Sequence, residues 1–160
     1  MHPTAQRVAD AGRRAGLELE IRQFPEGTRT AEDAARAVGC TVAQIVKSLV
    51  FMADEEPVLA LVSGADRVDM GRLAVATGAG ETRRATGDEA RSATGFAIGG
   101  VPPFGHGSPL TVLVDPGLLT HEVVWAAAGL PDAVFAIRPD DLVRVSGGTV
   151  AELAEDRPDA

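Results

Sequence analysis

The amino-acid sequence predicts an α+β (mixed α/β) fold, with a mixed sheet or barrel of about six or seven strands surrounded by short helices. Three observations indicate this class: apolar β-branched runs bounded by turn residues, short helical segments that begin at capping residues, and a hairpin pattern in the middle of the chain. With 160 residues the chain is long enough for one domain, which we expect over residues 1–155, followed by a mobile tail at 156–160.

In the first half of the chain, capping residues mark the helices and apolar alternation marks the strands. Thr4, Thr30 and Thr41 each precede a helical pattern, and a carboxylate or amide side chain follows the second and third of them at capping-box spacing. The acidic residues 54–56 separate two apolar runs, which predicts a hairpin. The helices are expected at 4–17, 30–39 and 41–46, and the strands at 17–24, 47–53 and 57–64.

In the second half, Asp69 and Thr86 are the expected caps of two further helices. A loop rich in glycine and proline separates them from a β-branched run that ends at Asp115. The alanine-rich segment around Trp125 predicts another helix. The helices are expected at 70–78, 87–95 and 119–129, and the strands at 110–115, 132–138 and 141–148.

The charge balance argues against several classes of partner. Fifteen basic and twenty-three acidic residues give a formal charge of −8. Because nonspecific nucleic-acid binding depends on neutralising phosphates with Lys and Arg, we expect no DNA partner. The basic doublets Arg13-Arg14 and Arg83-Arg84 are expected to be solvated, with a phosphate contact as the alternative. No apolar run approaches the ~18 residues of a membrane span and residues 1–16 lack a signal-peptide pattern, so we expect a cytoplasmic protein without a membrane partner.

The sequence contains none of the common cofactor or metal motifs. The single cysteine, Cys40, cannot form an internal disulfide, no partner stands out that would make it a nucleophile, and the three histidines are not spaced as metal ligands. The glycine patterns of nucleotide-binding loops and the G-x-S-x-G pattern of serine hydrolases do not occur. We therefore expect no cofactor and no metal.

Lys47 is the only lysine of the chain, because the other fourteen basic residues are arginine. It begins the apolar run KSLVFMA, where an unpaired charge is costly. A guanidinium cannot imitate a compact ammonium with rotatable donors, or a group whose pKa is lowered by burial. These features favour a functional role for Lys47 over a strand-end side chain that lays its stem on the core and keeps its charge in water.

The segment GGVPPFGHGSP, residues 99–109, consists mainly of glycine and proline. Backbone preferences are expected to set its shape, which leaves N–H groups available. A surface connector and a loop whose backbone lines a ligand site both remain open. His106 is either a base or a solvated side chain, and Asp115 either lies near the site or caps the following turn.

The order of these features is the most informative property of the chain. Phe24 at a strand end is followed by a helix pair, VKSL at the start of a buried strand, TGFAIGGVPPFG, VLVD, and AAG ahead of VFAI. This order resembles the YbaK/ProX family of free-standing aminoacyl-tRNA deacylases, which are related to the editing domain inserted in bacterial prolyl-tRNA synthetases. The resemblance covers residues 22–145, and its most specific parts are K-[ST]-L and T-G-x-x-x-G-G-[VI]-x-P-x-G.

The resemblance implies roles for individual residues. In that family the lysine that matches Lys47 is required for activity, and the loop glycine that matches Gly100 presents backbone groups at the scissile ester. The match also implies that Ser48 touches the amino acid, that Phe24 flanks the pocket, and that Asp115 lies near the site.

The remaining implied substrate-binding residues are Gly99, Val101, Pro102 and His106 of the loop, and Gly129 of the Ala-Gly pair. The chain departs from the family at two positions. Pro102 stands where members often have Ser, and the cysteinyl-tRNA-specific members have Ser where this chain has Ala127.

The sequence therefore predicts a trans-editing aminoacyl-tRNA deacylase that hydrolyses the ester of a mischarged tRNA, with a small amino acid such as alanine on tRNA-Pro as the substrate. The expected partner is the terminal adenosine end of an aminoacyl-tRNA, and an aminoacyl-tRNA synthetase is a further candidate. One alternative is a non-catalytic module that binds the same end or docks on a synthetase. Another is a small-molecule esterase, against which stands the lack of an identifiable nucleophile and base.

Overall fold

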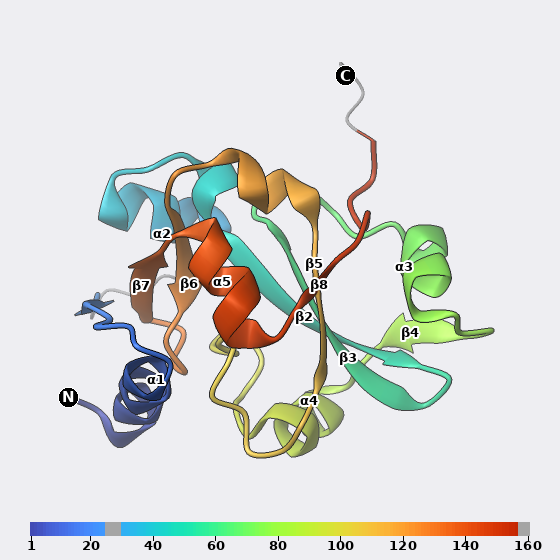
Figure 1. Cartoon of the computed structure of the whole chain (residues 1–160), viewed down its shortest axis with the longest axis horizontal. Helices are drawn as coiled ribbons and strands as arrows, with labels where there is room; N and C mark the ends of the chain where they lie inside the picture. Colours follow the sequence, from blue (N-terminus) through green and yellow to red (C-terminus); the bar gives the residue numbers. More distant parts are fainter. Residues whose placement is uncertain (25–29, 157–160) are drawn as a thin grey trace.

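The structure, a computed structural model, describes residues 1–24 and 30–156 and has the α+β class that the sequence predicts (Figure 1). Within these residues, eight strands form a three-stranded sheet in the order β1-β7-β6 and a five-stranded sheet in the order β4-β2-β3-β5-β8. The expectation of about six or seven strands in one sheet or barrel is therefore corrected to two separate sheets. The strands are β1 (Ile21–Gln23), β2 (Val46–Ala53), β3 (Glu56–Ser63), β4 (Thr82–Arg84), β5 (Thr111–Val114), β6 (Val124–Ala127), β7 (Ala133–Ile137) and β8 (Thr149–Val150).

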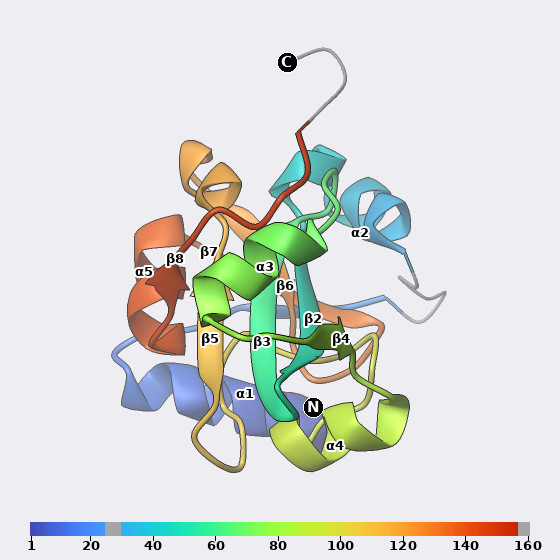
Figure 2. The same cartoon turned by 90° about the vertical axis from the view of Figure 1, so that its right-hand side faces the viewer.

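Helices cover both faces of the five-stranded sheet. They are α1 (Pro3–Arg14), α2 (Ala31–Val38), α3 (Met70–Thr77), α4 (Gly87–Thr94) and α5 (Pro139–Ser146), with 3-10 turns η1 (Val42–Gln44) and η2 (Pro116–Thr120). Figure 2 shows α3 across one face, where its Leu73 packs in a core cluster with Phe51 and Val62. The larger cluster lies on the other face and joins the sheet to α1, α4, α5 and the smaller sheet through residues such as Val8 and Phe135.

The predicted helix caps at Thr30, Asp69 and Thr86 are confirmed, whereas Thr41 precedes only the 3-10 turn η1 and not the helix expected over 41–46. The Thr30 hydroxyl accepts the N–H of Asp33 at 3.1 Å, and Thr86 forms the predicted capping box with α4. Helix α1 begins at Pro3 rather than after Thr4, because the Nδ1 atom of His2 accepts the Thr4 N–H at 3.0 Å. The fixed φ of proline suits this first helical position.

The predicted hairpin is confirmed. Strands β2 and β3 pair antiparallel from Val46 opposite Ser63 to Ala53 opposite Glu56. Asp54 and Glu55 form the turn with φ values of 48° and 64°, a conformation that L-residues rarely adopt. The Asp54 carboxylate supports it by accepting the N–H groups of Gly80 and Glu81.

Strand β4, which the sequence analysis missed, is short and leaves part of β2 uncovered. It pairs only from Phe51 opposite Arg84 to Ala53 opposite Thr82, and the Ala85 N–H donates to the Val50 carbonyl. Within the described residues, β4 thus does not extend along the first half of β2. There the smaller sheet approaches instead, through a parallel bridge between Ile45 and Trp125.

Residues 119–129 do not form the predicted helix. The structure has η2 followed by strand β6, which pairs antiparallel with β7 from Val124 opposite Ile137 to Ala127 opposite Val134. Alanine favours a helix locally, but the pairing with β7 buries Val124 and Ala126 almost completely. Tertiary contacts therefore override the local preference.

Residues 141–148 also differ from the prediction, because most of them belong to helix α5 rather than to a strand. Pro139 occupies the first helical turn, Asp140 and Asp141 lie near the positive end of the helix dipole, and Gly147 ends the helix with a φ of 67°. The strand that follows, β8, pairs parallel with β5.

The expected tail at 156–160 lies outside the described residues except for Asp156, whose carboxylate pairs with Arg72 of α3 at 2.8 Å. In the described ranges, no helix has both the length and the apolar character needed to cross a membrane.

Candidate functional site

A pocket of about 330 Å³ lies along the part of β2 that β4 leaves uncovered. This volume fits a small molecule or the end of a larger one. Its polar side chains are those of Thr30, Lys47, Ser48 and Arg84. The rest of the lining is apolar apart from Gly99, and comprises Ala31, Ala34, Ile45, Val46, Leu49, Val50, Ile98, Val101, Trp125, Ala126, Ala127, Pro131 and Val134.

Lys47 is half-buried in the wall of this pocket. Its Nζ donates a hydrogen bond to the main-chain carbonyl of Asp66, which follows β3. Burial lowers the pKa of Lys47, the carboxylates of Asp66 and Glu32 oppose this shift, and Arg67 and Arg84 add to it. Because an ammonium has three donors, Lys47 can hold the Asp66 carbonyl and still donate to a ligand.

Ser48, the next residue on β2, brings a buried hydroxyl to the pocket. Its Oγ atom has no hydrogen-bond partner among the described residues. A buried hydroxyl without a partner costs about 1–3 kcal/mol, and native structures rarely leave one unsatisfied. A bound ligand or water that pairs with Ser48 would recover this cost.

The loop between α4 and β5 forms another part of the wall. Gly99 and Val101 line the pocket, and Gly99 has a φ of 93°, which favours glycine. Gly100 between them is buried against the main chain of Leu130: a Cβ atom at this position would lie 2.9 Å from the Leu130 N, Cα and C atoms. Residues 100–104 are all buried, so this stretch is an inner wall rather than a surface connector.

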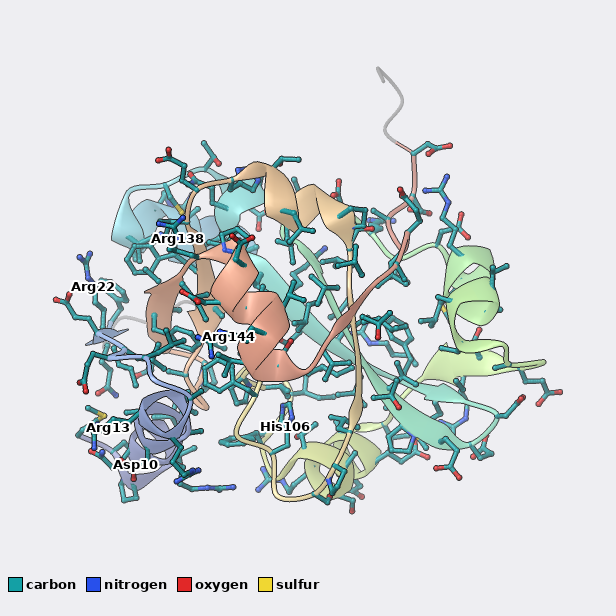
Figure 3. The ribbon with its side chains drawn as sticks, in the orientation of Figure 1. Asp10, Arg13, Arg22, His106, Arg138 and Arg144 are labelled. Atoms are coloured by element: carbon teal, nitrogen blue, oxygen red, sulfur yellow. The ribbon has the colours of Figure 1, made fainter. Side chains whose placement is uncertain are left out.

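His106 and Pro102 lie outside the pocket lining and brace the loop. Figure 3 labels His106 on the loop that follows α4. Its Nε2 atom is 2.8 Å from the Pro102 carbonyl, and its ring packs edge-to-face on Phe96. Burial lowers the pKa of His106, and the contact with Pro102 opposes this shift. His106 is therefore neither a solvated side chain nor a base positioned in the pocket.

Phe24 is half-buried at the end of β1 and does not line the pocket. Its N–H donates to the Asp132 carbonyl at 2.8 Å and continues the pairing of β1 with β7. Gly129 also lies outside the lining. It has a φ of 93°, and a Cβ atom there would approach the Thr4 side chain to 2.9 Å.

Two roles were open for Asp115, one near the site and one as a cap, and the structure shows it as the cap of η2. It is 3% exposed and its carboxylate accepts the N–H groups of Gly117, Leu153 and Ala154, each at 2.9 Å. These bonds join the end of β5 to the C-terminal segment, and Asp115 does not line the pocket.

Most of the lining was not identified from the sequence, and Trp125, Ile98 and Arg84 are the larger side chains among the residues missed. Trp125 was assigned to a helix, although it lies on β6 with the Arg22 guanidinium 5.1 Å from the centre of its ring. Ile98 was taken only as part of the loop motif. The doublet Arg83-Arg84 was the available signal for Arg84, and of these two residues Arg84 lines the pocket.

Together these groups place a cation, an unsatisfied hydroxyl and a glycine-containing backbone wall around one apolar cavity. Such a site can hold a polar group between Lys47 and the loop while small apolar side chains surround the rest of the ligand. Chemically, the site can stabilise negative charge on an oxygen atom of a ligand, because a cation in a partly buried pocket acts on that charge more strongly than it would in water.

Comparison with known proteins agrees with this arrangement. Among curated relatives, the uncharacterized protein YwhH of Bacillus subtilis (strain 168) is 28% identical over 129 residues, which cover 81% of this chain and 82% of YwhH. The proline–tRNA ligase of Limosilactobacillus fermentum is 31% identical over 109 residues, which cover 64% of this chain and 19% of the ligase. The chain thus corresponds to a small part of that enzyme.

A solved structure, described as that of a proposed trans-editing enzyme for prolyl tRNA synthetase, superposes with a TM-score of 0.92 and 46% sequence identity. The superposition covers 98% of this chain and 99% of that one. The sequence model described as "Aminoacyl-tRNA editing domain" matches residues 25–145, which include β2, the loop and the pocket. The chain therefore belongs to the aminoacyl-tRNA editing domain family.

Proposed function

We propose that this protein is a trans-editing aminoacyl-tRNA deacylase that hydrolyses the ester between a wrongly attached amino acid and the terminal adenosine of a tRNA. The observation that carries this proposal is the single lysine, half-buried in an apolar pocket next to the unpartnered hydroxyl of Ser48. Membership of the editing-domain family and the description of the superposed structure support it. Because editing accompanies translation, we place the activity in the cytoplasm.

In the proposed mechanism, Lys47 is the catalytic cation. Water attacks the ester carbonyl, negative charge develops on the carbonyl oxygen, and the ammonium of Lys47 stabilises that charge. The bond between the acyl carbon and the ribose oxygen then breaks, the ribose oxygen takes the proton that the water gives up, and the free amino acid and the tRNA are released. The bond to the Asp66 carbonyl holds the Lys47 side chain in place, so less reorganisation is needed at the moment of reaction. An aminoacyl ester is already activated, so no covalent enzyme intermediate is required.

The loop acts in this mechanism as a fixed backbone wall. Gly99 and Val101 line the pocket and orient the ester, while Gly100 seats the loop against Leu130. A side chain at Gly100 would displace the wall. Gly100 is therefore a positioning residue in this proposal, and His106 supports the wall through the Pro102 carbonyl.

The preferred substrate in this proposal carries a small amino acid, with alanine on tRNA-Pro as the first candidate. The pocket volume of about 330 Å³ lies at the lower end of the range for ligand pockets, and its largely apolar lining suits a small apolar side chain. In this proposal Ser48 pairs with a polar group of the aminoacyl moiety, which would satisfy a buried hydroxyl that has no partner among the described residues. The name of the superposed structure also points to prolyl-tRNA synthetase as the enzyme whose errors are removed.

Deacylation of a panel of mischarged tRNAs by the wild-type protein tests the proposal. The panel includes alanyl-, cysteinyl- and seryl-tRNA-Pro, and correctly charged prolyl-tRNA-Pro is the control. We expect the fastest turnover on alanyl-tRNA-Pro and little on the control, because a pocket discriminates one methylene group by about 1–3 kcal/mol. Absence of turnover on every member would contradict the proposal and favour a non-catalytic binding module.

A further inference from the structure

Arg84 lines the pocket and is exposed to solvent, as is Ile98, and the part of the pocket that these two residues line is here called the mouth. It is the last residue of β4 and lies opposite Phe51 of β2, so the two side chains share one face of the sheet. Lys47 lies four residues before Phe51 on the same strand and therefore on that face as well. The Arg84 guanidinium is 5.7 Å from the centre of the Phe51 ring.

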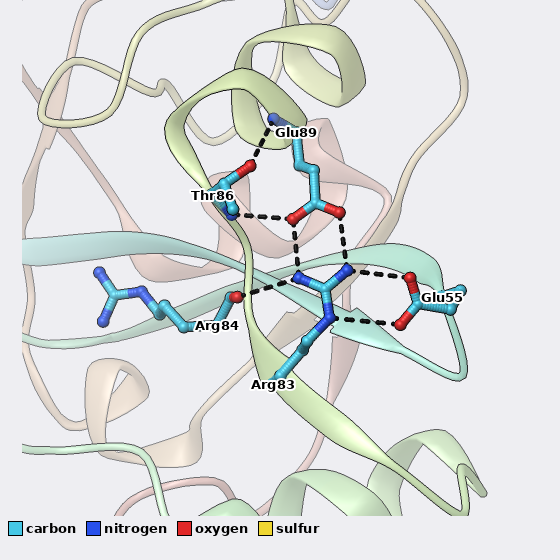
Figure 4. Close-up of polar contacts among 5 residues, drawn as sticks. All are labelled: Glu55, Arg83, Arg84, Thr86 and Glu89. Atoms are coloured by element: carbon cyan, nitrogen blue, oxygen red, sulfur yellow. Dashed lines mark hydrogen bonds and ion pairs between the residues drawn. The ribbon is translucent and has the colours of Figure 1, made fainter.

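The neighbouring Arg83 forms ion pairs with two carboxylates and does not line the pocket. Figure 4 shows its guanidinium between the carboxylates of Glu55 and Glu89, with Arg84 pointing away from this cluster. Arg83 contacts Glu55 at 2.9 Å and Glu89 at 2.7 Å, which joins β4 to the hairpin turn and to the start of α4. These contacts hold β4 in position, and with it the backbone from which Arg84 extends.

Arg84, by contrast, has no ion-pair partner among the described residues. The charge of Arg84 acts on Lys47 in the pocket wall, because Arg84, like Arg67, lowers the pKa of Lys47. The carboxylates of Asp66 and Glu32 act on Lys47 in the opposite direction, so Arg84 is the lining guanidinium that, among the described residues, has no carboxylate paired with it. This arrangement attracts an anionic group.

The same mouth exposes an apolar side chain. Ile98 lines the pocket and is 53% exposed, one of the few large apolar side chains at the surface of the described residues. It lies near α4, where a Cβ atom built on Gly87 would be 3.9 Å from its Cδ1 atom. The mouth therefore offers a guanidinium and an apolar surface together, which matches the phosphate and the base of one nucleotide.

From this juxtaposition we infer that Arg84 binds the phosphate on the 5′ side of the terminal nucleotide and that Ile98 packs against its base. This inference rests on the proposed function and deepens it, because it assigns the pocket mouth to the nucleotide and the interior to the amino acid. A guanidinium can donate two parallel hydrogen bonds to a phosphate. Arg84 is then a binding and positioning residue for the ester that Lys47 acts on.

Binding of 5′-AMP and of adenosine, followed by the fluorescence of the single tryptophan Trp125 in the pocket wall, tests the inference without requiring turnover. We expect the wild-type protein to bind 5′-AMP about tenfold more tightly than adenosine, as a charge-assisted contact predicts. Arg84→Gln removes the preference for 5′-AMP and leaves the affinity for adenosine unchanged. Arg84→Lys retains part of the preference for 5′-AMP. Ile98→Ser weakens both ligands.

Arg13→Gln is the matched control, because it removes the same charge from α1, where Arg13 pairs with Asp10 and does not line the pocket. A second measurement is the salt dependence of binding to uncharged tRNA. Loss of one phosphate contact lowers the slope of log K against log[salt] by about 0.7 in Arg84→Gln and leaves it unchanged in Arg13→Gln.

The outcomes separate this inference from the proposed function. If Arg84→Gln keeps the preference for 5′-AMP, or if the wild-type protein binds adenosine as well as 5′-AMP, the phosphate assignment is wrong even where deacylation is observed. If the preference depends on Arg84 but no charged tRNA is hydrolysed, the nucleotide site stands and the deacylase proposal fails.

Discussion

Substitution of Gly100 by alanine tests the account of the loop quantitatively. The new Cβ atom would lie 2.9 Å from three main-chain atoms of Leu130, whereas ordinary contacts begin at 3.4 Å. The loop and Leu130 must therefore separate by about 0.5 Å, and neither can rotate a side chain away. Overpacking of this kind costs about 1–3 kcal/mol in free energy of unfolding.

The displaced wall should also slow the reaction. Because a misplacement of about 1 Å costs about a hundredfold in rate, we expect Gly100→Ala to lower deacylation per folded molecule by about tenfold. Gly107→Ala in the same loop is the control, since Gly107 is exposed, has no positive φ, and a Cβ atom there meets nothing within 4 Å. It should be neutral or slightly stabilising.

Urea unfolding and single-turnover deacylation of the two variants provide the measurements. The reasoning is refuted if Gly100→Ala matches the wild-type protein in both stability and rate, because the contact with Leu130 would then be unimportant. Equal losses of stability and of deacylation rate in Gly100→Ala and Gly107→Ala would also refute it, since any added methyl group in the loop would then have the same effect, with or without a contact to Leu130.

Three further predictions concern groups around the site. Burial lowers the pKa of His106, so its contribution to stability is full above about pH 6.5, the ordinary histidine value, and is lost as the pH falls through the lowered folded-state pKa. His106→Gln should flatten this part of the stability profile in urea unfolding and cost less than tenfold in deacylation. Hydrogen bonds from Arg83 and from the Thr86 N–H lower the pKa of Glu89 to about 2, and NMR titration of Arg83→Gln should find this pKa raised but still below 4.5, because the bond from Thr86 remains. Asp115→Ala should reduce the free energy of unfolding by about 2–4 kcal/mol, because three backbone N–H groups lose their acceptor, while the deacylation rate per folded molecule stays within about twofold; a specific loss of rate would return Asp115 to the site.

The sequence predicted those parts of the fold that local chemistry determines. The cap at Thr30, the capping box at Thr86 and the hairpin between β2 and β3 all follow from side chains within a few residues of each other. Burial of Lys47 was inferred from its apolar neighbours, and the structure agrees. The resemblance to an editing family was sufficient to identify the family.

Elements that depend on distant contacts were predicted poorly. Strand β6 is rich in alanine and is fixed by its pairing with β7, which no local pattern encodes. Helix α5 has helical signals at Pro139 and Gly147, although the segment DLVRVSGG was predicted to form a short strand. Strand β4 has only three residues and two of them are arginine, too short a pattern to recognise.

The residues of the site divide in the same way, into those that a local motif predicts and those that distant contacts bring together. Lys47, Ser48, Gly99 and Val101 were predicted together and line one pocket. The sequence could not place Trp125, Ile98 and Arg84 beside them, because β6, the loop and β4 meet β2 only in the folded chain. For Asp115 the sequence left a role near the site and a capping role open, and the structure shows its carboxylate bound to main-chain N–H groups.

The central claim is that Lys47 supplies the catalytic charge, and the most direct test compares deacylation by the wild-type protein, Lys47→Ala and Lys47→Arg on the best tRNA of the panel. We expect Lys47→Ala to lose about two to three orders of magnitude in single-turnover rate and Lys47→Arg not to restore it, because a planar guanidinium cannot keep the same geometry. Urea unfolding should show both variants folded. Full activity in Lys47→Ala would contradict the account.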